Sequence, residues 1–532
     1  MSESCKTVAI LGAGVTGLTA IKCSLDEGLQ PTCFERFDSI GGLWTYRDTD
    51  AEYQSASVYK TTVTNTSKET CAFSDFPFPK EWPNYMHHSY MNKYLNMYAD
   101  EFGLKKCIRL STSVTRLEQA PDYDISGRWV VTTKHKNEME TSQEFDAVMI
   151  CTGMFNNPFT PDVPGMDEFQ GKISHTNGYR TATEFEGKRG VVVGIGNSAG
   201  DAAAETSRVA SQVFLSARHG MWLASRRGPK GYPIELAIMR RRFLRPLSMV
   251  MRSLEKSFEE RYEMVQKPLK PSFGILASEL LLNEDIPGCI LNGSVVVKGD
   301  LARFTKTGVE FVDGSREDII DFVIFATGYR FDFPFKTDCP ALQVLDQHVP
   351  LYKLVFPLGL KHNTLSVNGH IKPLGAVGPC AELQARWAAR VFKGLAKLPS
   401  QSELAAEVKM ADEEMAANFA NHHRHVFSLL YMENIATEIG ARPNFLKMFF
   451  TDPEMSLRCV FGPAVSFHYR LVGPGKWAGA RDAIATVWDR VREPMKTRKP
   501  TNQTTKNGSQ TLFVCLGIAV LVAVVGVLMV CN

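Results

Sequence analysis

The sequence contains no Cys-x-x-Cys pair, although it has 12 cysteines. The strand-like, apolar settings of Cys33 and Cys151 predict reduced, buried thiols rather than a disulfide framework. No positively charged, apolar leader precedes the first predicted strand, so we expect no secretory signal peptide. The net charge is only +3 over 532 residues, which is smaller than the positive charge expected of a general nucleic-acid binder. We therefore expect a chain that faces a reducing compartment and binds no nucleic acid.

A convincing set of metal ligands is also missing. The histidine run at 421–425 places His422 and His425 at i,i+3, but no carboxylate or cysteine completes a site. This pattern predicts a solvated helix end rather than a metal centre. The length indicates two or three domains, and a hydrophobic fraction of 44% is ordinary for a globular protein.

One glycine-rich turn follows the first predicted strand. The apolar run 8–11 leads through Gly12, Gly14 and Gly17 into a helical pattern, and the next strand ends in Glu35. Strand, glycine turn, helix, strand and acid together form the fingerprint of a dinucleotide site. The glycines allow a tight turn and close approach of the backbone to pyrophosphate, and the acid accepts hydrogen bonds from ribose hydroxyls.

A second turn repeats this pattern with one change. The β-branched strand 191–193 is followed by Gly194, Gly196 and Ala199, and alanine is tolerated at the third position because that residue packs the helix. Two turns predict two dinucleotides, with FAD on the first and NADPH on the second.

The choice of NADPH depends on the strand after the second turn. It ends without an acid and offers Ser216 and Arg218 instead, with Arg226 and Arg227 close behind. An arginine accommodates a 2′-phosphate, which an acid would repel. The alternative is that these arginines form a solvated surface.

Two buried-strand patterns, 145–153 and 321–329, bracket the second nucleotide unit and predict crossings between two domains. We expect an α/β protein with two Rossmann-like dinucleotide-binding domains, the NADPH domain inserted in the FAD domain, and a C-terminal transmembrane helix. The predicted division is 1–160 FAD domain, first part; 161–330 NADPH domain; 331–445 FAD domain, second part; 446–510 C-terminal extension and linker; 511–531 anchor.

The anchor is predicted from the uncharged run between Thr511 and Cys531. A helix of this length spans roughly 30 Å, the thickness of a bilayer core. Basic residues such as Lys496 and Arg498 precede the run, which predicts that the large N-terminal part is cytosolic. A second basic and apolar segment, 234–258, is predicted to lie either against an anionic membrane or at the surface as an ordinary helix pair.

A more specific pattern lies between the two turns. FQGKISHTNGY, with Phe169, Gly171, His175 and Tyr179, resembles the identifying FxGxxxHxxxY motif of the flavin-containing monooxygenase family. TNTSKE, FPFPKEWPNYM, KPLGA and LVGPGKWAGARDAI resemble the vertebrate branch of that family, and DGSREDIIDFVIFATGYRFDFPF resembles its fifth isoform. The resemblance extends from about Val8 to the C-terminus, and it favours a tail anchor in the endoplasmic reticulum membrane with a cytosolic catalytic part.

The resemblance implies roles for individual residues. Those implied to contact FAD are Gly12, Ala13, Gly14, Val15, Thr16, Gly17, Glu35, Gly42, Leu43 and Trp44. Those implied to lie beside the flavin ring and the nicotinamide are Thr64, Asn65 and Thr66, with Asn65 as the catalytic residue. Those implied for NADPH are Gly194, Gly196, Ser198, Ala199, Gly200, Asp201, Ser216 and Arg218. His175 is expected to be structural rather than catalytic.

The implied reaction is NADPH- and O₂-dependent oxygenation of soft nucleophilic nitrogen or sulfur centres in small xenobiotic or metabolic molecules, through a C4a-hydroperoxyflavin. Because the cofactor carries this chemistry, no metal or nucleophile array is needed. A Baeyer–Villiger monooxygenase acting on ketones, an uncoupled NADPH oxidase and an inactive tail-anchored scaffold remain alternatives, and the oligomeric state stays open. Asn368 and His370 depart from the family's apolar residues in a segment expected near the flavin, which leaves local polarity and substrate preference open.

Overall fold

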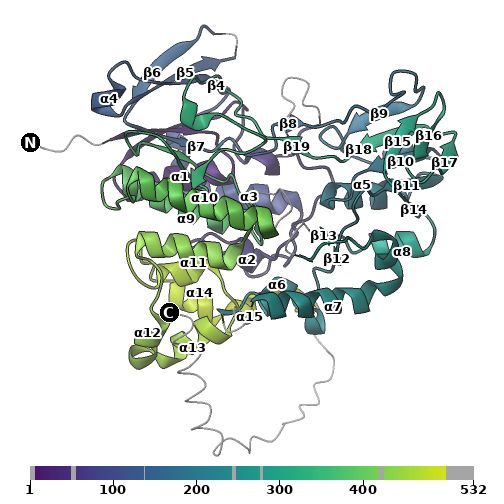
Figure 1. Cartoon of the computed structure of the whole chain (residues 1–532). Coiled ribbons are helices and arrows are strands. Elements are labelled where there is room, and N and C mark those ends of the chain that lie inside the picture. Colours follow the sequence, from purple (N-terminus) through teal and green to yellow (C-terminus); the bar gives the residue numbers. More distant parts are fainter. Residues whose placement is uncertain are drawn as a thin grey trace, which may run out of the picture.

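Two parallel five-stranded sheets, one in each half of the molecule, organise the fold (Figure 1). The computed structural model describes residues 6–48, 56–136, 138–241, 247–275, 280–418 and 425–498. The first sheet has the strand order β22-β7-β1-β2-β3. Its strands are β1 (Thr7–Leu11), β2 (Gln30–Phe34), β3 (Ile108–Arg109), β7 (Ala147–Ile150) and β22 (Leu365–Val367).

The second sheet repeats this plan in the order β14-β11-β10-β18-β9. Its strands are β9 (Lys172–His175), β10 (Arg189–Val193), β11 (Gln212–Ser216), β14 (Val295–Lys298) and β18 (Phe322–Phe325). In both sheets the central strand, β1 or β10, leads into a glycine turn and a helix, α1 (Val15–Asp26) or α5 (Asn197–Thr206). The predicted α/β class with two nucleotide-binding units is therefore confirmed.

Each unit also carries a three-stranded antiparallel sheet, which lies between β3 and β7 of the chain in the first unit and between β14 and β18 in the second. In the first unit the strands are β4 (Thr112–Gln119), β5 (Trp129–His135) and β6 (Thr141–Phe145). In the second they are β15 (Leu301–Phe304), β16 (Gly308–Phe311) and β17 (Arg316–Asp318).

The path of the chain shows that the second unit is inserted in the first. The chain leaves the first sheet after β7 and returns to it at β22, which pairs in parallel with β7. At the crossings, β8 (Asn157–Pro158) pairs antiparallel with β19 (Tyr329–Arg330). Every strand of the second sheet lies within the predicted NADPH domain, 161–330, although the individual domain boundaries stay predictions.

Alternation along β1 explains how the first sheet is covered on both faces. Val8 and Ile10 pack in the cluster formed with α1, α3 (His88–Glu101) and α9 (Val377–Phe392). Ala9 and Leu11 point to the other face and pack with Trp129 and Phe145 of the antiparallel sheet. A continuous apolar run such as 8–11 is typical of a strand in a parallel sheet that is buried on both faces.

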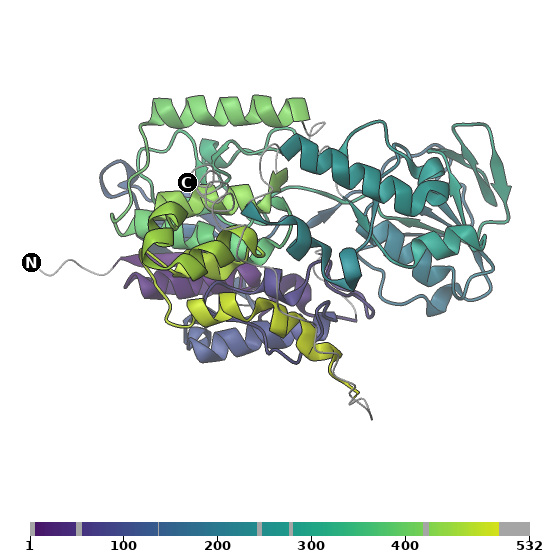
Figure 2. The ribbon, with the colours of Figure 1, turned by 90° about the horizontal axis from the view of Figure 1, so that it is seen from below.

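The remaining elements connect and cover the two units. The short strands are β12 (Leu223–Ala224), β13 (Leu281–Leu282), β20 (Leu351–Tyr352), β21 (Phe356–Pro357), β23 (Lys372–Leu374) and β24 (His425–Phe427). The further helices are α2 (Lys68–Cys71), α4 (Tyr123–Ser126), α6 (Ile234–Ile238), α7 (Leu247–Gln266), α8 (Ile286–Leu291), α10 (Gln401–Asn418), α11 (Ser428–Ile439), α12 (Phe445–Thr451), α13 (Pro453–Phe461), α14 (Ala480–Ala485) and α15 (Val487–Arg492). Figure 2, which views the molecule from below, shows the yellow C-terminal helices in front of the first unit.

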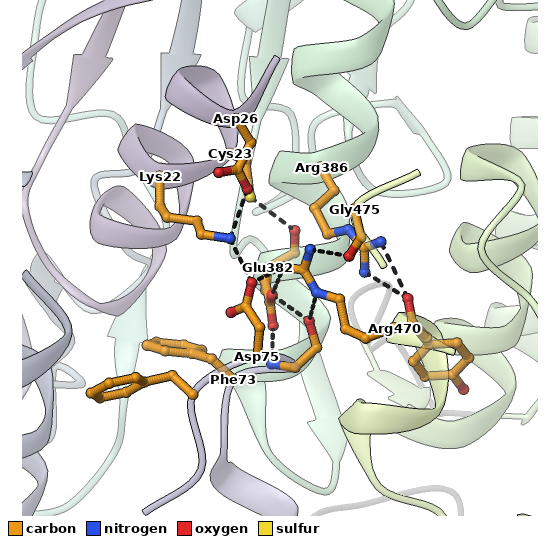
Figure 3. A network of polar contacts seen from close by, with 12 residues as sticks. Lys22, Cys23, Asp26, Phe73, Asp75, Glu382, Arg386, Arg470 and Gly475 are labelled. Carbon is orange, nitrogen blue, oxygen red and sulfur yellow. Dashed lines mark hydrogen bonds and ion pairs between the residues drawn. The ribbon is translucent and has the colours of Figure 1, made fainter. Parts of the chain in front are cut away.

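A buried ionic network fastens this C-terminal extension to the first unit (Figure 3). Arg470 donates to Glu382 of α9 at 2.8 Å and forms an ion pair with Asp75 at 2.7 Å. Asp75 also pairs with Lys22 of α1. Glu382 is fully buried and accepts two further hydrogen bonds from the backbone and hydroxyl of Ser74.

The predictions for the basic segment and the histidine run need correction, and part of the histidine run and the whole predicted anchor lie outside the described residues. Arg241, in the segment predicted to be basic and at the surface, is buried and donates to Glu433 and to Nδ1 of His468 at 2.6 Å, so it joins the segment after α6 to α11 and to the C-terminal extension. His425 is buried in β24 rather than at a solvated helix end, while His422 is outside the described residues. The predicted anchor at 511–531 is outside them as well, and none of the helices that are described has the length and apolarity to span a membrane.

Candidate active site

Both glycine turns open into one cavity of about 1370 Å³. A site for one small molecule typically has roughly 300–1,000 Å³, so this space exceeds what a single ligand needs. Its lining includes Gly12 and Gly14 from the first turn and Gly196 and Ser198 from the second. The fold thus brings two predicted dinucleotide sites together in a shared space.

The first turn is built for close contact with a ligand. Gly12 has φ +105°, and a Cβ there would lie 2.7 Å from the carbonyl oxygen of Cys151. Gly14 is the N-cap of α1 and no side chain caps this helix, so its first N–H groups remain available. Glu35 is buried; its two oxygens accept from the backbone N–H of Ala13 at 2.7 Å and of Phe37 at 3.0 Å. Each oxygen retains a lone pair for a hydroxyl group of a ligand.

The second turn has the same construction. Gly194 has φ +120°, and a Cβ there would lie 2.5 Å from the carbonyl oxygen of Ala326. Gly196 is the N-cap of α5, again without a side-chain cap. A Cβ at Gly196 would meet no protein atom within 4 Å, so this position faces open space in the cavity. Uncapped helix N-termini of this kind bind phosphate groups through backbone N–H groups and the helix dipole.

The structure places most predicted site residues at the cavity. Those that line it are Gly12, Gly14, Val15, Thr16, Glu35, Gly42, Leu43, Trp44, Thr64, Asn65, Thr66, Gly196, Ser198 and Asp201. Those that do not are Ala13, Gly17, Gly194, Ala199, Gly200, Ser216 and Arg218. Several of the second group support the turns instead. A Cβ at Gly17 would overlap the carbonyl oxygen of Gly12 at 1.8 Å, and Ala199 is buried in the core behind α5.

Asn65, the predicted catalytic residue, is held from the second unit. Its side-chain oxygen accepts a hydrogen bond of 2.8 Å from Nη2 of Arg226. Because the oxygen is engaged, the side-chain NH₂ group of Asn65 is the donor available to the cavity. The neighbouring Thr64 is fixed by paired hydrogen bonds with the backbone of Met86.

The arginines expected near the NADPH phosphate take separate roles. Arg226 binds Asn65, and Arg227 forms an ion pair with Glu284 at 2.7 Å. Arg218 is exposed at the end of β11, whereas the hydroxyl of Ser216 is turned inward and donates to the carbonyl of Gly299. Of these candidates, Arg218 therefore keeps a guanidinium that no side chain of the described residues engages.

Comparison with known proteins adds to this geometry. A family described as flavin-binding monooxygenase-like matches residues 5–532. The chain belongs to this family. It is 46% identical to flavin-containing monooxygenase 5 of Cavia porcellus, with 98% of each chain covered, and 44% identical to that of Homo sapiens, with 95% of this chain and 96% of the relative covered. It is 42% identical to dimethylaniline monooxygenase (N-oxide-forming) 2 of Mus musculus over 93% of this chain and 94% of the relative.

Solved structures share the fold at lower identity. S-allyl-L-cysteine S-oxygenase from Allium sativum matches with a TM-score of 0.63 and 24% identity over 86% of this chain and 95% of that chain. Open cyclohexanone monooxygenase matches with a TM-score of 0.60 and 17% identity over 81% and 97%. The predicted resemblance and the predicted enzyme class, an FAD- and NADPH-dependent monooxygenase, are confirmed.

The residues of this flavin-binding monooxygenase fit both cofactors. The cavity of about 1370 Å³ is larger than a typical site for one small molecule, and each half ends on an uncapped helix N-terminus with glycines where side chains would block approach. Glu35 is placed beside the first turn and the second turn lacks an equivalent acid, as the predicted difference between the two cofactors requires.

The family motif has a structural role here. The Nε2 of His175 lies 3.1 Å from the carbonyl oxygen of Gly328, and burial lowers the pKa of this imidazole. The hydroxyl of Tyr179 donates to Glu205 of α5 at 2.8 Å. Neither side chain lines the cavity. The motif therefore braces α5 and the crossing at β19 rather than reacting with a ligand.

Sequence analysis missed the contacts from the first unit that reach α5. The hydroxyl of Tyr59 donates to Asp201, whose other oxygen accepts from Asn283 at 2.6 Å. Burial raises the pKa of the Asp201 carboxyl, although both hydrogen bonds oppose this shift. Tyr59 follows no motif and precedes Asp201 by 142 residues, so no local pattern marks it.

Asn368 and His370, which depart from the family pattern, do not line the cavity. Asn368 is buried and its NH₂ group lies 3.7 Å from the sulfur of Met149, while the ring of His370 packs on Phe331 at 3.9 Å. Their neighbours Gly369 and Ile371 form the lining instead. These two side chains therefore add no polar group to the lining of the cavity.

Proposed function

We propose that the chain oxygenates soft nucleophilic nitrogen and sulfur centres of small molecules, with NADPH and dioxygen as co-substrates. The observation that carries this proposal is the shared cavity, in which both dinucleotide turns and the side chain of Asn65 meet. Support for heteroatom chemistry comes from the relative named as N-oxide-forming, which is 42% identical to this chain.

FAD, when bound, accepts a hydride from NADPH and activates dioxygen. The side chains of the protein hold the two cofactors, orient them and shield the reacting atoms from water. Glu35 and the first turn would hold the FAD ribose and pyrophosphate, and Gly196 with Ser198 would hold the pyrophosphate of NADPH. Asn65 supplies a neutral NH₂ donor whose direction is fixed by Arg226. A neutral donor stabilises developing negative charge without releasing a proton into the site.

Part of the cavity wall belongs to neither turn and is apolar. Ile275, Leu280 and Leu282 come from the second unit, and Val426 and Phe427 come from β24. This wall suits an apolar substrate body and keeps water from the reacting atoms. The Baeyer–Villiger alternative has less support, because the cyclohexanone and steroid monooxygenases resemble this chain at only 17–19% identity, which bears on the fold alone.

The decisive experiment uses purified, flavin-loaded protein, NADPH and ¹⁸O₂ with a thioether, a tertiary amine and an aliphatic ketone. Mass spectrometry follows the products while NADPH absorbance is recorded. We expect label in the sulfoxide and the N-oxide. Label in an ester instead would establish the Baeyer–Villiger alternative, and NADPH consumption that yields only peroxide would indicate an uncoupled oxidase. No NADPH consumption would favour the scaffold alternative.

We also propose that residues 511–531 anchor the enzyme in the endoplasmic reticulum membrane, with the catalytic part cytosolic and membrane lipid as a partner. The uncharged run and the basic residues before it support this proposal. Expression of the full chain and of a variant ending at Gln510, followed by alkaline extraction of membranes, tests it. The full chain is expected to stay with the membrane and the shortened chain to be released; release of both would refute the anchor.

A further inference from the structure

Helix α6 of the second unit presents a buried carboxylate to the turn that carries Asn65. Glu235 is only 4% exposed. Its Oε1 accepts from the backbone N–H of Ser67 at 2.5 Å and lies 3.4 Å from the hydroxyl of Thr70. Its Oε2 lies 3.3 Å from the hydroxyl oxygen of Tyr85.

These contacts connect Glu235 to both neighbours of the Asn65 side chain. Tyr85 also contacts the carbonyl oxygen of Arg226, and Arg226 donates to the side-chain oxygen of Asn65. Ser67 is two residues beyond Asn65 along the chain. Glu235 therefore fixes the backbone on one side of Asn65 directly, and through Tyr85 it fixes the arginine on the other side.

The way Glu235 is buried is unusual for a structural acid. Buried carboxylates are normally paired with a cation, yet among the described residues no Lys, Arg or His forms an ion pair with Glu235. Its partners are a backbone N–H and two hydroxyl groups. An acid held only by neutral donors contributes little to stability, because desolvation offsets the hydrogen bonds. Its contacts are instead concentrated on the Asn65 turn.

We infer that Glu235 is a positioning residue for Asn65, an inference that rests on the proposed function. The carboxylate keeps the Asn65 turn at the distance from the cofactor space that oxygenation requires, although it does not itself line the cavity. A displacement of about 1 Å at a catalytic group can reduce the rate about 100-fold.

Two variants of Glu235 separate positioning from simple loss of an acid. Glu235→Gln retains a carbonyl oxygen for the Ser67 N–H, whereas Glu235→Ala removes it. Each preparation is used only if its flavin content equals that of the wild type. The amount of product formed per NADPH consumed is then expected to fall about tenfold or more in Glu235→Ala and to be largely retained in Glu235→Gln. Tyr85→Phe removes the hydroxyl that connects Glu235 with Arg226 but leaves the contact between Glu235 and Ser67 in place. Its product ratio is expected to fall between those of the two Glu235 variants, and this variant remains available if Glu235→Ala does not fold.

A second readout does not depend on activity. Hydrogen exchange of the peptide covering 64–70, measured by mass spectrometry, is expected to accelerate in Glu235→Ala and to stay slow in Glu235→Gln. If the wild type formed no oxygenated product, the proposed function would fail while this exchange measurement would still decide whether Glu235 holds the turn. Unchanged exchange in Glu235→Ala would overturn the inference.

A double-variant cycle gives the sharpest test. If Glu235 acts through Asn65, then Glu235→Ala should have little further effect on the product-to-NADPH ratio in an Asn65→Ala background. Full additivity of the two losses would overturn the inference. Glu433→Gln is the matched control, because Glu433 is also buried but pairs with Arg241 and Arg442 away from the cavity. This control is expected to lower stability without altering the product ratio.

Discussion

Arg226 donates a hydrogen bond of 2.8 Å to the side-chain oxygen of Asn65, across the boundary between the two nucleotide-binding units. This contact determines which end of the Asn65 amide faces the cavity, since the oxygen accepts from Arg226 and no group of the described residues accepts from the NH₂ group. The orientation of the predicted catalytic donor thus depends on how the inserted unit sits against the first. Relative motion of the two units would be transmitted to Asn65 directly.

Asn65→Asp is expected to abolish oxygenated product. A carboxylate would form an ion pair with Arg226, remove the NH₂ donor and place negative charge where negative charge develops during the reaction. Product should fall at least about 100-fold, by analogy with loss of one oxyanion donor, while flavin remains bound. Labelled-oxygen product analysis measures this. Asn292→Asp, an exposed cap of α8 outside the cavity, is the control; normal product from Asn65→Asp would refute the role of Asn65.

Alanine at the two turns should separate the two cofactors. Gly12→Ala forces a strained φ and a clash with Cys151, so we expect loss of flavin from the purified protein. Gly196→Ala introduces a methyl group that meets no protein atom but enters the space for NADPH. Its KM for NADPH should rise by about tenfold, the equivalent of about 1.4 kcal/mol, at unchanged flavin content. Equal loss of flavin in both variants would contradict the assignment.

Arg218 is expected to discriminate NADPH from NADH. It is exposed at the end of β11 where a 2′-phosphate is predicted, and no described side chain pairs with it. Arg218→Ala should raise the KM for NADPH by about tenfold and leave that for NADH nearly unchanged, because only the phosphate contact is lost. Steady-state NADPH and NADH oxidation tests this. Arg208→Ala, which removes a surface ion pair with Asp285, is the control.

Because of Lys68, we expect the free energy of unfolding to change with pH in the alkaline range. It is fully buried and bonds to the carbonyl of Trp82 at 2.7 Å, and burial lowers its pKa to about 8. In the unfolded chain the pKa of a lysine is about 10.4. Between these values the unfolded state binds more protons, so wild-type stability should rise with pH relative to Lys68→Met. Thermal midpoints of both proteins at pH 7.5, 9 and 10.5 would show this, and a constant difference would exclude it.

Glu382→Ala should destabilise the fold by about 3–5 kcal/mol, because it leaves the buried guanidinium of Arg470 with one acid fewer (Figure 3). Urea unfolding gives the magnitude, and limited proteolysis is expected to cut residues 446–495 first. Glu260→Ala, which breaks an exposed pair with Lys256, should change the stability by less than about 1 kcal/mol. Equal effects of the two variants would show that the network does not fasten the extension.

The two glycine turns were predictable because their requirements are local. A positive φ at Gly12 and Gly194, and an uncapped helix directly after each turn, are properties of a few consecutive residues. The burial of β7 and β18 was likewise predicted from the apolar runs within 145–153 and 321–329. The family motif was recognisable, but its residues alone did not reveal that Tyr179 would brace α5 through Glu205.

The sequence by itself determined the two nucleotide units and the order in which the chain crosses between them, whereas the role of Asn65 in the TNTSK turn as the catalytic donor stays a prediction that the family resemblance implies. Only the tertiary structure decided what orients that donor. Arg226 is 161 residues from Asn65, and Glu235 is 168 residues from Ser67. Contacts over such separations arise only when the inserted unit packs on the first, since hydrogen bonding between side chains carries no signal in local sequence. For the same reason Arg241, which the sequence placed at a basic surface, proved to be buried against Glu433.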